Sequence, residues 1–133
     1  MRKLLFILVL LAAAMAVRAQ DDDLLLQTWT FDQWERSYYL HAPETLTEPA
    51  PLLIALHERF GDGARMARLT HFNELADREG FIVAYPDGID GEWNFVRGIP
   101  GYDMPQDDTA FLAALISHIA EDYPVDRSRV YLA

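Results

Sequence analysis

The sequence has no cysteine, and its only lysine is Lys3. Without cysteine no disulfide can form, so the fold must be held together by its core alone. Acidic residues outnumber basic ones by 21 to 11, which gives a net charge of −10. Because so negative a surface repels phosphate groups and anionic lipid, we expect neither a nucleic-acid partner nor docking to an anionic membrane.

The first nineteen residues have the pattern of a secretory signal peptide. Arg2 and Lys3 precede an apolar run over 4–16, and Val17-Arg18-Ala19 offers small residues at the spacing of a cleavage site. The run is short for a membrane span, which needs about 20 apolar residues. We therefore expect cleavage after residue 19 and a secreted protein, extracellular or periplasmic, with no membrane attachment. An uncleaved N-terminal anchor is the alternative.

Loss of that segment would remove three basic residues and leave 8 arginines against 21 acidic residues, a net charge of −13. With 51% hydrophobic residues, the chain is too apolar for disorder.

The side chains of residues 27–31 alternate between two faces, with Gln27, Trp29 and Phe31 on one of them. The stretch 32–34 is typical of a turn, and a second strand is expected over 36–41. These segments predict an antiparallel hairpin at a sheet edge.

Three apolar segments do not alternate, which is typical of strands buried on both faces in a parallel sheet. They are Pro51–Leu56, Phe81–Tyr85 and a segment that opens at Val130. The loops after the first two begin at His57 and Pro86. Since function lies at the carboxyl ends of parallel strands, these loops are the first places to look for a site.

Amphipathic helices are expected between these strands. One covers 65–79, with Leu69, Phe72, Leu75 and Ala76 on its apolar side, and ends at Gly80. The other is capped by Asp107 or Asp108 and ends before Pro124. Its apolar face is formed by Phe111, Leu112, Leu115, Ile116, Ile119 and Tyr123. The predicted fold class is α/β: a mostly parallel sheet with an N-terminal antiparallel hairpin and helices on both faces.

Several segments, taken together, resemble those of a known family. Pro51–His57 is similar to the apolar strand that ends in Leu-His-Gly in α/β-hydrolases. Four further segments resemble the polyhydroxybutyrate depolymerase and feruloyl esterase group of secreted esterases, in order and in spacing. They are Leu75–Gly88, Trp93-Asn94, Asp107–Leu112 and Val125–Tyr131. The resemblance covers residues 36–133 and implies a partial α/β-hydrolase fold.

The resemblance also implies where the catalytic residues lie. In that family the strand opened by Val130 runs into a Gly-x-Ser-x-Gly turn that carries the nucleophile, with Asp and His further on. The three serines of this sequence, Ser37, Ser117 and Ser128, are not in such a turn and are interpreted as surface or capping residues. We therefore expect no catalytic residue here. Residues 20–133 would be the N-terminal part of the catalytic domain, with the Ser, Asp and His beyond Ala133.

The resemblance further implies a role for the loop after the first buried strand. In α/β-hydrolases this loop donates a backbone N–H to the oxyanion hole, and Glu58 and Arg59 occupy the corresponding positions. Glu58, Arg59 and Phe60 stand where the family has glycine-rich sequence. His57 is expected to support the loop as a structural residue. Trp93 and Asn94 are expected to line a pocket or, as the alternative, to anchor their own loop.

Nothing in the sequence predicts a metal or an organic cofactor. His57-Glu58 begins a zinc-binding His-Glu-x-x-His motif, but Gly61 stands in the fifth position. The acidic segment 87–92 lacks the register of a calcium loop and is interpreted as a turn. The remaining histidines are scattered over separate elements.

The function predicted for the full-length protein is a secreted serine carboxylic-ester hydrolase. Candidate substrates are polyhydroxyalkanoate esters and the feruloyl or acetyl esters of plant polysaccharide. The 133-residue chain by itself is expected to be inactive. Two alternatives remain: a non-catalytic secreted binding module on the same fold, and an exported peptidase or dienelactone-hydrolase relative. A serine turn directly after Ala133 would favour catalysis.

Overall fold

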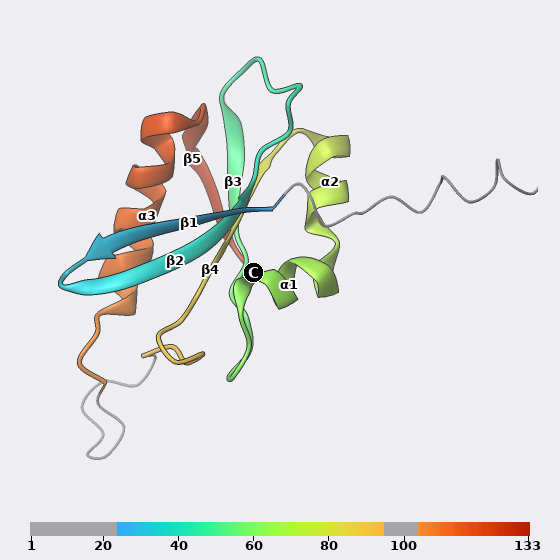
Figure 1. Ribbon diagram of the computed structural model, residues 1–133. Coiled ribbons are helices and arrows are strands. Elements are labelled where there is room, and N and C mark those ends of the chain that lie inside the picture. Colours follow the sequence, from blue (N-terminus) through green and yellow to red (C-terminus); the bar gives the residue numbers. More distant parts are fainter. Residues whose placement is uncertain (1–23, 95–103) are drawn as a thin grey trace, which may run out of the picture.

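The structure is a computed structural model that describes residues 24–94 and 104–133. The predicted signal peptide lies outside these residues. The described elements are β1 (Leu25–Phe31), β2 (Trp34–His41), β3 (Ala50–Ile54), α1 (Gly63–Thr70), α2 (Phe72–Glu79), β4 (Ile82–Pro86), α3 (Asp108–Asp122) and β5 (Val125–Leu132). Figure 1 shows one twisted sheet with α3 on one face and α1 and α2 on the other.

The predicted hairpin forms one edge of the sheet. β1 pairs antiparallel with β2, and β2 pairs antiparallel with β4. The turn has only two residues, Asp32 and Gln33, both with positive φ (46° and 64°), as tight hairpins require. Trp29 and Phe31 are partly buried and pack near Phe111 of α3, as the alternation predicted.

The strand order is β1-β2-β4-β3-β5, and β3 is parallel to both β4 and β5. Leu53 pairs with Val83 on one side and Tyr131 on the other, so the three strands predicted as parallel lie next to one another. All five residues of β4 are buried. Together with the hairpin and the two helix layers, this pairing confirms the predicted fold class.

The sheet separates two apolar clusters. The larger lies under α3, whose Phe111, Leu115 and Ile119 are buried against residues of β2, β3 and β4. The smaller lies under α1 and α2, where Ala67 and Ala76 pack near Val83 and Tyr85. Because apolar area removed from water drives folding, these two interfaces hold the helices against the two faces of the sheet.

The prediction of one continuous helix over 65–79 was wrong. His71 adopts a left-handed conformation (φ 54°) and separates α1 from α2. The break turns Leu69 outward, where 61% of it is exposed, although the pattern placed it on the apolar side. Phe72 and Ala76 still face the sheet, and Gly80 (φ 74°) ends α2 as predicted.

The strand that was predicted to open at Val130 starts earlier, since β5 begins at Val125, and its register against β3 is irregular. The strand was expected to be buried, yet 56% of Tyr131 and 60% of Leu132 are exposed. β5 is the edge strand of the sheet, so among the described residues only β3 pairs with it.

Candidate active site

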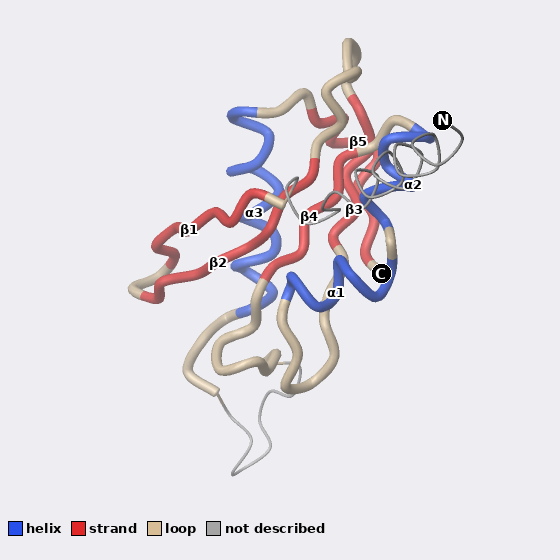
Figure 2. The backbone as a smooth tube through the Cα atoms, turned by 45° about the vertical axis from the view of Figure 1, so that its right-hand side comes forward, coloured by secondary structure: helices blue, strands red, loops and turns tan. Residues whose placement is uncertain are grey.

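The loops after β3 and β4 leave the sheet at the same end and lie beside each other (Figures 1 and 2). One runs from the end of β3 to Gly63, the first residue of α1, and the other follows Pro86. Phe60 N–H donates to the Gly91 carbonyl over 2.7 Å, which joins the two loops directly. This carboxyl end of the parallel strands is where sequence analysis placed the site.

His57 is buried between the two loops, with 3% of it exposed. Its Nε2 accepts a hydrogen bond from the Gly88 N–H (2.9 Å), and its Nδ1 lies 2.8 Å from the Glu58 carbonyl oxygen. A ring that accepts at Nε2 and donates at Nδ1 is a neutral imidazole in one tautomer. Both ring nitrogens are therefore occupied by backbone groups, which is a structural arrangement.

Two peptide units of the loop are held by their carbonyl oxygens. The His57 carbonyl accepts from Trp93 Nε1 (3.1 Å), and the Glu58 carbonyl accepts from Gly61 N–H (2.9 Å) as well as facing His57. In a trans peptide the N–H points opposite to the C=O. The N–H groups of Glu58 and Arg59 therefore point away from these partners, and neither donates to another residue that the structure describes.

The charged side chains of the loop are paired with neighbouring groups. Glu58 contacts Arg65 of α1 (3.0 Å), and Arg59 contacts Glu92 (2.8 Å). Phe60 adopts the left-handed conformation (φ 63°) that glycine favours. The turn thus forms without the glycine-rich sequence of the resembled family, and the Glu58 carboxylate is paired with Arg65.

Asp87 connects β2, α1 and the loop after β4 at this end of the sheet. The interpretation of residues 87–92 as a turn did not predict these contacts. The two carboxylate oxygens of Asp87 accept from the Ser37 hydroxyl (2.6 Å) and from the Gly63 N–H at the start of α1 (2.7 Å). A Cβ on Gly63 would lie 2.3 Å from the Tyr85 carbonyl oxygen, so glycine allows α1 to start this close to β4. An acidic residue directly after a buried strand was the available signal.

Trp93 and Asn94 use their polar groups to fix loops. The Trp93 ring lies 5.0 Å from the His57 ring, and its indole N–H is the donor described above. The Asn94 side chain donates to the carbonyls of Met104 and Gln106 (3.0 and 2.7 Å), and its backbone N–H donates to Asp108 (2.6 Å). These contacts correspond to the anchoring alternative for the two residues.

A buried ion pair completes the network. Arg36 of β2 lies 2.7 Å from Asp108 of α3, and both side chains are at most 5% exposed. The Arg36 guanidinium also lies over the Phe111 ring (3.7 Å) and donates to the Asp87 carbonyl (3.2 Å). The sequence predicted Asp108 only as a residue at the start of its helix. Asp107 is the cap, accepting from Ala110 N–H.

In the part of the chain that the structure describes, the hydroxyl groups of the three serines form hydrogen bonds with residues other than histidine. The Ser37 hydroxyl donates to Asp87, the Ser128 hydroxyl donates to Asp126 (2.6 Å), and that of Ser117 accepts from Arg127 (3.3 Å). A serine nucleophile needs an adjacent base and an orienting group. None of these hydroxyls has that environment.

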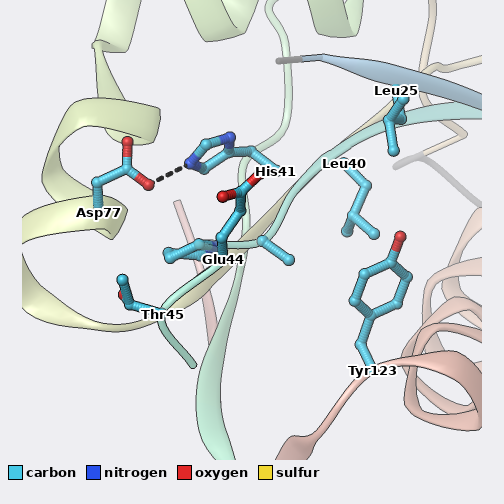
Figure 3. A pocket seen from close by; sticks show the side chains of 9 residues that line it. Leu25, Leu40, His41, Glu44, Thr45, Asp77 and Tyr123 are labelled. Atoms are coloured by element: carbon cyan, nitrogen blue, oxygen red, sulfur yellow. Dashed lines mark hydrogen bonds and ion pairs between the residues drawn. The ribbon is translucent and has the colours of Figure 1, made fainter. Parts of the chain in front are cut away.

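A pocket of about 540 Å³ lies away from this site, beyond the His41 end of β2 (Figure 3). His41 is hydrogen-bonded to Asp77 there (2.7 Å), which resembles the base and orienting group of a triad. His41 pairs with Val83 near the start of β4, however, so the pocket lies at the amino end of the parallel strands. The pair joins β2 to α2 and does not face the two loops.

The described residues include no cluster of three or more His, Asp or Glu side chains arranged to hold a metal ion. Among the same residues, no helix is sufficiently long and apolar to cross a bilayer.

The sheet order, the helices on both faces and the loops at the carboxyl ends of β3 and β4 define a partial α/β-hydrolase fold. A solved ferulic acid esterase has the same fold, with a TM-score of 0.61 and 22% identity over 82% of this chain and 47% of that one. No family model matches the sequence.

Relatives in sequence are esterases. The chain is 34% identical over 100 residues to a bifunctional acetylxylan esterase/xylanase of Neocallimastix patriciarum, and 25% identical over 100 residues to an acetylxylan esterase of Coprinopsis cinerea. These alignments cover 74% and 72% of this chain, but it spans only 14% and 27% of the relatives. The chain is thus homologous to one part of esterases of the α/β-hydrolase type.

Proposed function

We propose that this chain is the first part of a secreted serine carboxylic-ester hydrolase, and that its nucleophile follows Ala133. The observation that carries the proposal is the parallel set β4-β3-β5, which brings the end of β5 next to the loop 57–61. Leu56 N–H donates to the Ala133 carbonyl (2.8 Å), so a residue following Ala133 would start beside that loop. A nucleophilic serine of this type sits on a sharp turn directly after a strand, and β5 would be that strand.

The chemistry assigned to the present residues is oxyanion stabilisation. The Glu58 and Arg59 N–H groups are fixed by the peptide contacts of His57, Trp93 and Gly61, so they need no reorganisation when charge develops. A nucleophilic serine would attack the ester carbonyl, form an acyl-enzyme and release the alcohol. Water would then hydrolyse the acyl-enzyme.

Acetyl esters of plant polysaccharide are the favoured substrates, because two homologues are acetylxylan esterases. The acidic surface also suits a neutral polymer better than an anionic one. Feruloyl esters and polyhydroxyalkanoates form the comparison set in the assay.

A fluorophosphonate probe tests the proposal, since it labels activated serines covalently. The complete gene product should be labelled and should hydrolyse 4-nitrophenyl acetate, whereas the 133-residue chain should do neither. Labelling of the 133-residue chain would place the nucleophile within it. A complete product that is folded, unlabelled and inactive would instead favour the non-catalytic binding module.

A further inference from the structure

Phe60 stands out among the residues of the candidate site because it is an apolar ring turned to solvent. Its exposure is 69%, while its backbone is held in the left-handed region at φ 63°. That conformation is unfavourable for a residue with a Cβ, and such conformations persist where the surroundings enforce them, often at binding sites.

The surroundings of Phe60 enforce its position from both sides. Its N–H donates to the Gly91 carbonyl (2.7 Å), and the backbone of Gly91 lies so close that a Cβ there would be 3.2 Å from the Phe60 Cα. The Arg59 guanidinium lies 4.5 Å from the centre of the ring and is itself fixed by Glu92 (2.8 Å). The ring is thus supported on one face by a cation and is presented to solvent.

We propose that Phe60 is a substrate-binding platform that stacks against a sugar ring of a neutral polysaccharide ester. This inference rests on the proposed function, and it assigns the alcohol side of the substrate to this loop. An aromatic face next to charged side chains suits a sugar, which has apolar C–H faces and hydroxyl groups around its edge. Arg59 and Glu92 provide the donors and acceptors for those hydroxyls.

The position of Phe60 matches this role. It is one residue from Arg59, whose N–H is a proposed oxyanion donor, so a sugar on the ring would lie near the ester carbonyl. An acyl group would be better accommodated by an enclosed apolar pocket than by a ring with 69% exposure. An open platform also lets a polymer extend past the site in both directions.

The test uses the complete gene product and three substitutions at one position. Phe60→Gly removes the ring and suits the positive φ, Phe60→Ala removes the ring without adding glycine flexibility, and Phe60→Trp keeps an aromatic face. Leu69→Ala is the matched control, because Leu69 is also an exposed apolar residue (61%) but lies at the far end of α1. Affinity electrophoresis in gels containing deacetylated xylan measures binding without any reaction.

Phe60→Gly and Phe60→Ala are expected to weaken retention by xylan roughly tenfold, and to lower kcat/KM on acetylated xylan by a similar factor. Their kcat/KM on 4-nitrophenyl acetate, which carries no sugar, should fall by a clearly smaller factor than their kcat/KM on acetylated xylan. Phe60→Trp and Leu69→Ala should behave like the wild type in every assay.

Equal retention of wild type and Phe60→Gly, or no retention of the wild type, would overturn the platform. The same is true if both esters lose activity in parallel. Failure of the proposed function looks different: no ester is hydrolysed by any variant, while the xylan gel still reports whether Phe60 binds sugar.

Discussion

Arg36 and Asp108 form an ion pair of 2.7 Å that connects the edge hairpin to the start of α3 in the interior of the protein. Buried charges are unfavourable unless they are paired, and removal of one partner leaves the other uncompensated. Because Asp108 also accepts from the Asn94 N–H, this pair holds the second loop of the candidate site as well.

Substitution of one partner should therefore be strongly destabilising. Arg36→Met and Asp108→Leu should each lower the free energy of unfolding by about 3–5 kcal/mol, as measured by urea denaturation. The double variant should be more stable than the sum of the two losses predicts. Strictly additive losses would show that the two charges do not interact.

Acidic pH should lower the stability of the start of β5 through protonation of Asp126. Hydrogen bonds from Ser128 and Arg129 lower the pKa of this carboxyl group to about 2. A lowered pKa means that the stabilisation is complete above the unfolded pKa, about 3.9, and is lost as the pH falls toward 2. Because the group is exposed, the effect is small.

Asp126→Asn should reduce the slope of stability against pH between about pH 4 and pH 2. Thermal denaturation at closely spaced pH values measures this slope, and Asp90→Asn in the loop after β4 serves as the control. Identical slopes for wild type and Asp126→Asn would contradict the assignment.

Alkaline pH should lower the stability of the fold through ionisation of Tyr85. Burial raises the pKa of its phenol to about 12, and the hydroxyl donates to Asn73 (2.7 Å). Since the pKa is raised, the stabilisation is present below the unfolded value of about 10 and is lost as the pH rises toward 12. Tyr85→Phe should lower the free energy of unfolding by about 1 kcal/mol at pH 7 and flatten this alkaline loss. Urea denaturation between about pH 9 and pH 12 measures this loss. If wild type and Tyr85→Phe lose the same stability over this range, Tyr85 is not the group responsible.

Local patterns predicted the elements whose packing they directly reflect. The alternation at Trp29 and Phe31 predicted a half-buried hairpin strand, and the unbroken apolar run at Leu52 and Ile54 predicted a central strand, because burial on one or two faces dictates these patterns. The break at His71 was missed, since apolar residues continue on both sides and nothing local marks a left-handed residue.

The sequence indicated where to look for the candidate site but predicted none of the contacts that connect its residues. Function lies at the carboxyl ends of parallel strands, so the predicted strands directed attention to the loops that begin at His57 and Pro86. The contacts of Arg36 with Asp108 and of Trp93 with His57 join residues that are 72 and 36 positions apart in the numbering, so no sequence window contains both partners. Only packing brings them together.

Trp93 should act on the reaction through the loop that it holds. Trp93→Phe keeps a ring beside His57 but removes the N–H donor to the His57 carbonyl, which orients the Glu58 N–H. In the complete enzyme we expect kcat to fall with KM nearly unchanged, since an oxyanion donor acts in the transition state. A rise in KM at constant kcat would instead assign Trp93 to the substrate pocket, the role that sequence analysis also considered.

Arg59 allows the backbone donor to be separated from its side chain. Arg59→Pro removes the N–H that points away from the Glu58 carbonyl, whereas Arg59→Ala keeps the N–H and removes the side-chain contacts with Glu92 and the Phe60 ring. Loss of one oxyanion donor lowers kcat by about 10²–10³. We expect that loss for Arg59→Pro on 4-nitrophenyl acetate, and near wild-type kcat for Arg59→Ala.

Glu58→Pro provides the comparison between the two candidate donors, because it removes the preceding N–H from the same loop. Circular dichroism and the unfolding midpoint establish that each variant is folded before kcat is measured. The variant with the larger loss of kcat at equal stability identifies the donor. If both proline variants are folded and fully active, the carbonyl oxygen of the ester does not bind to this loop, and the oxyanion assignment fails.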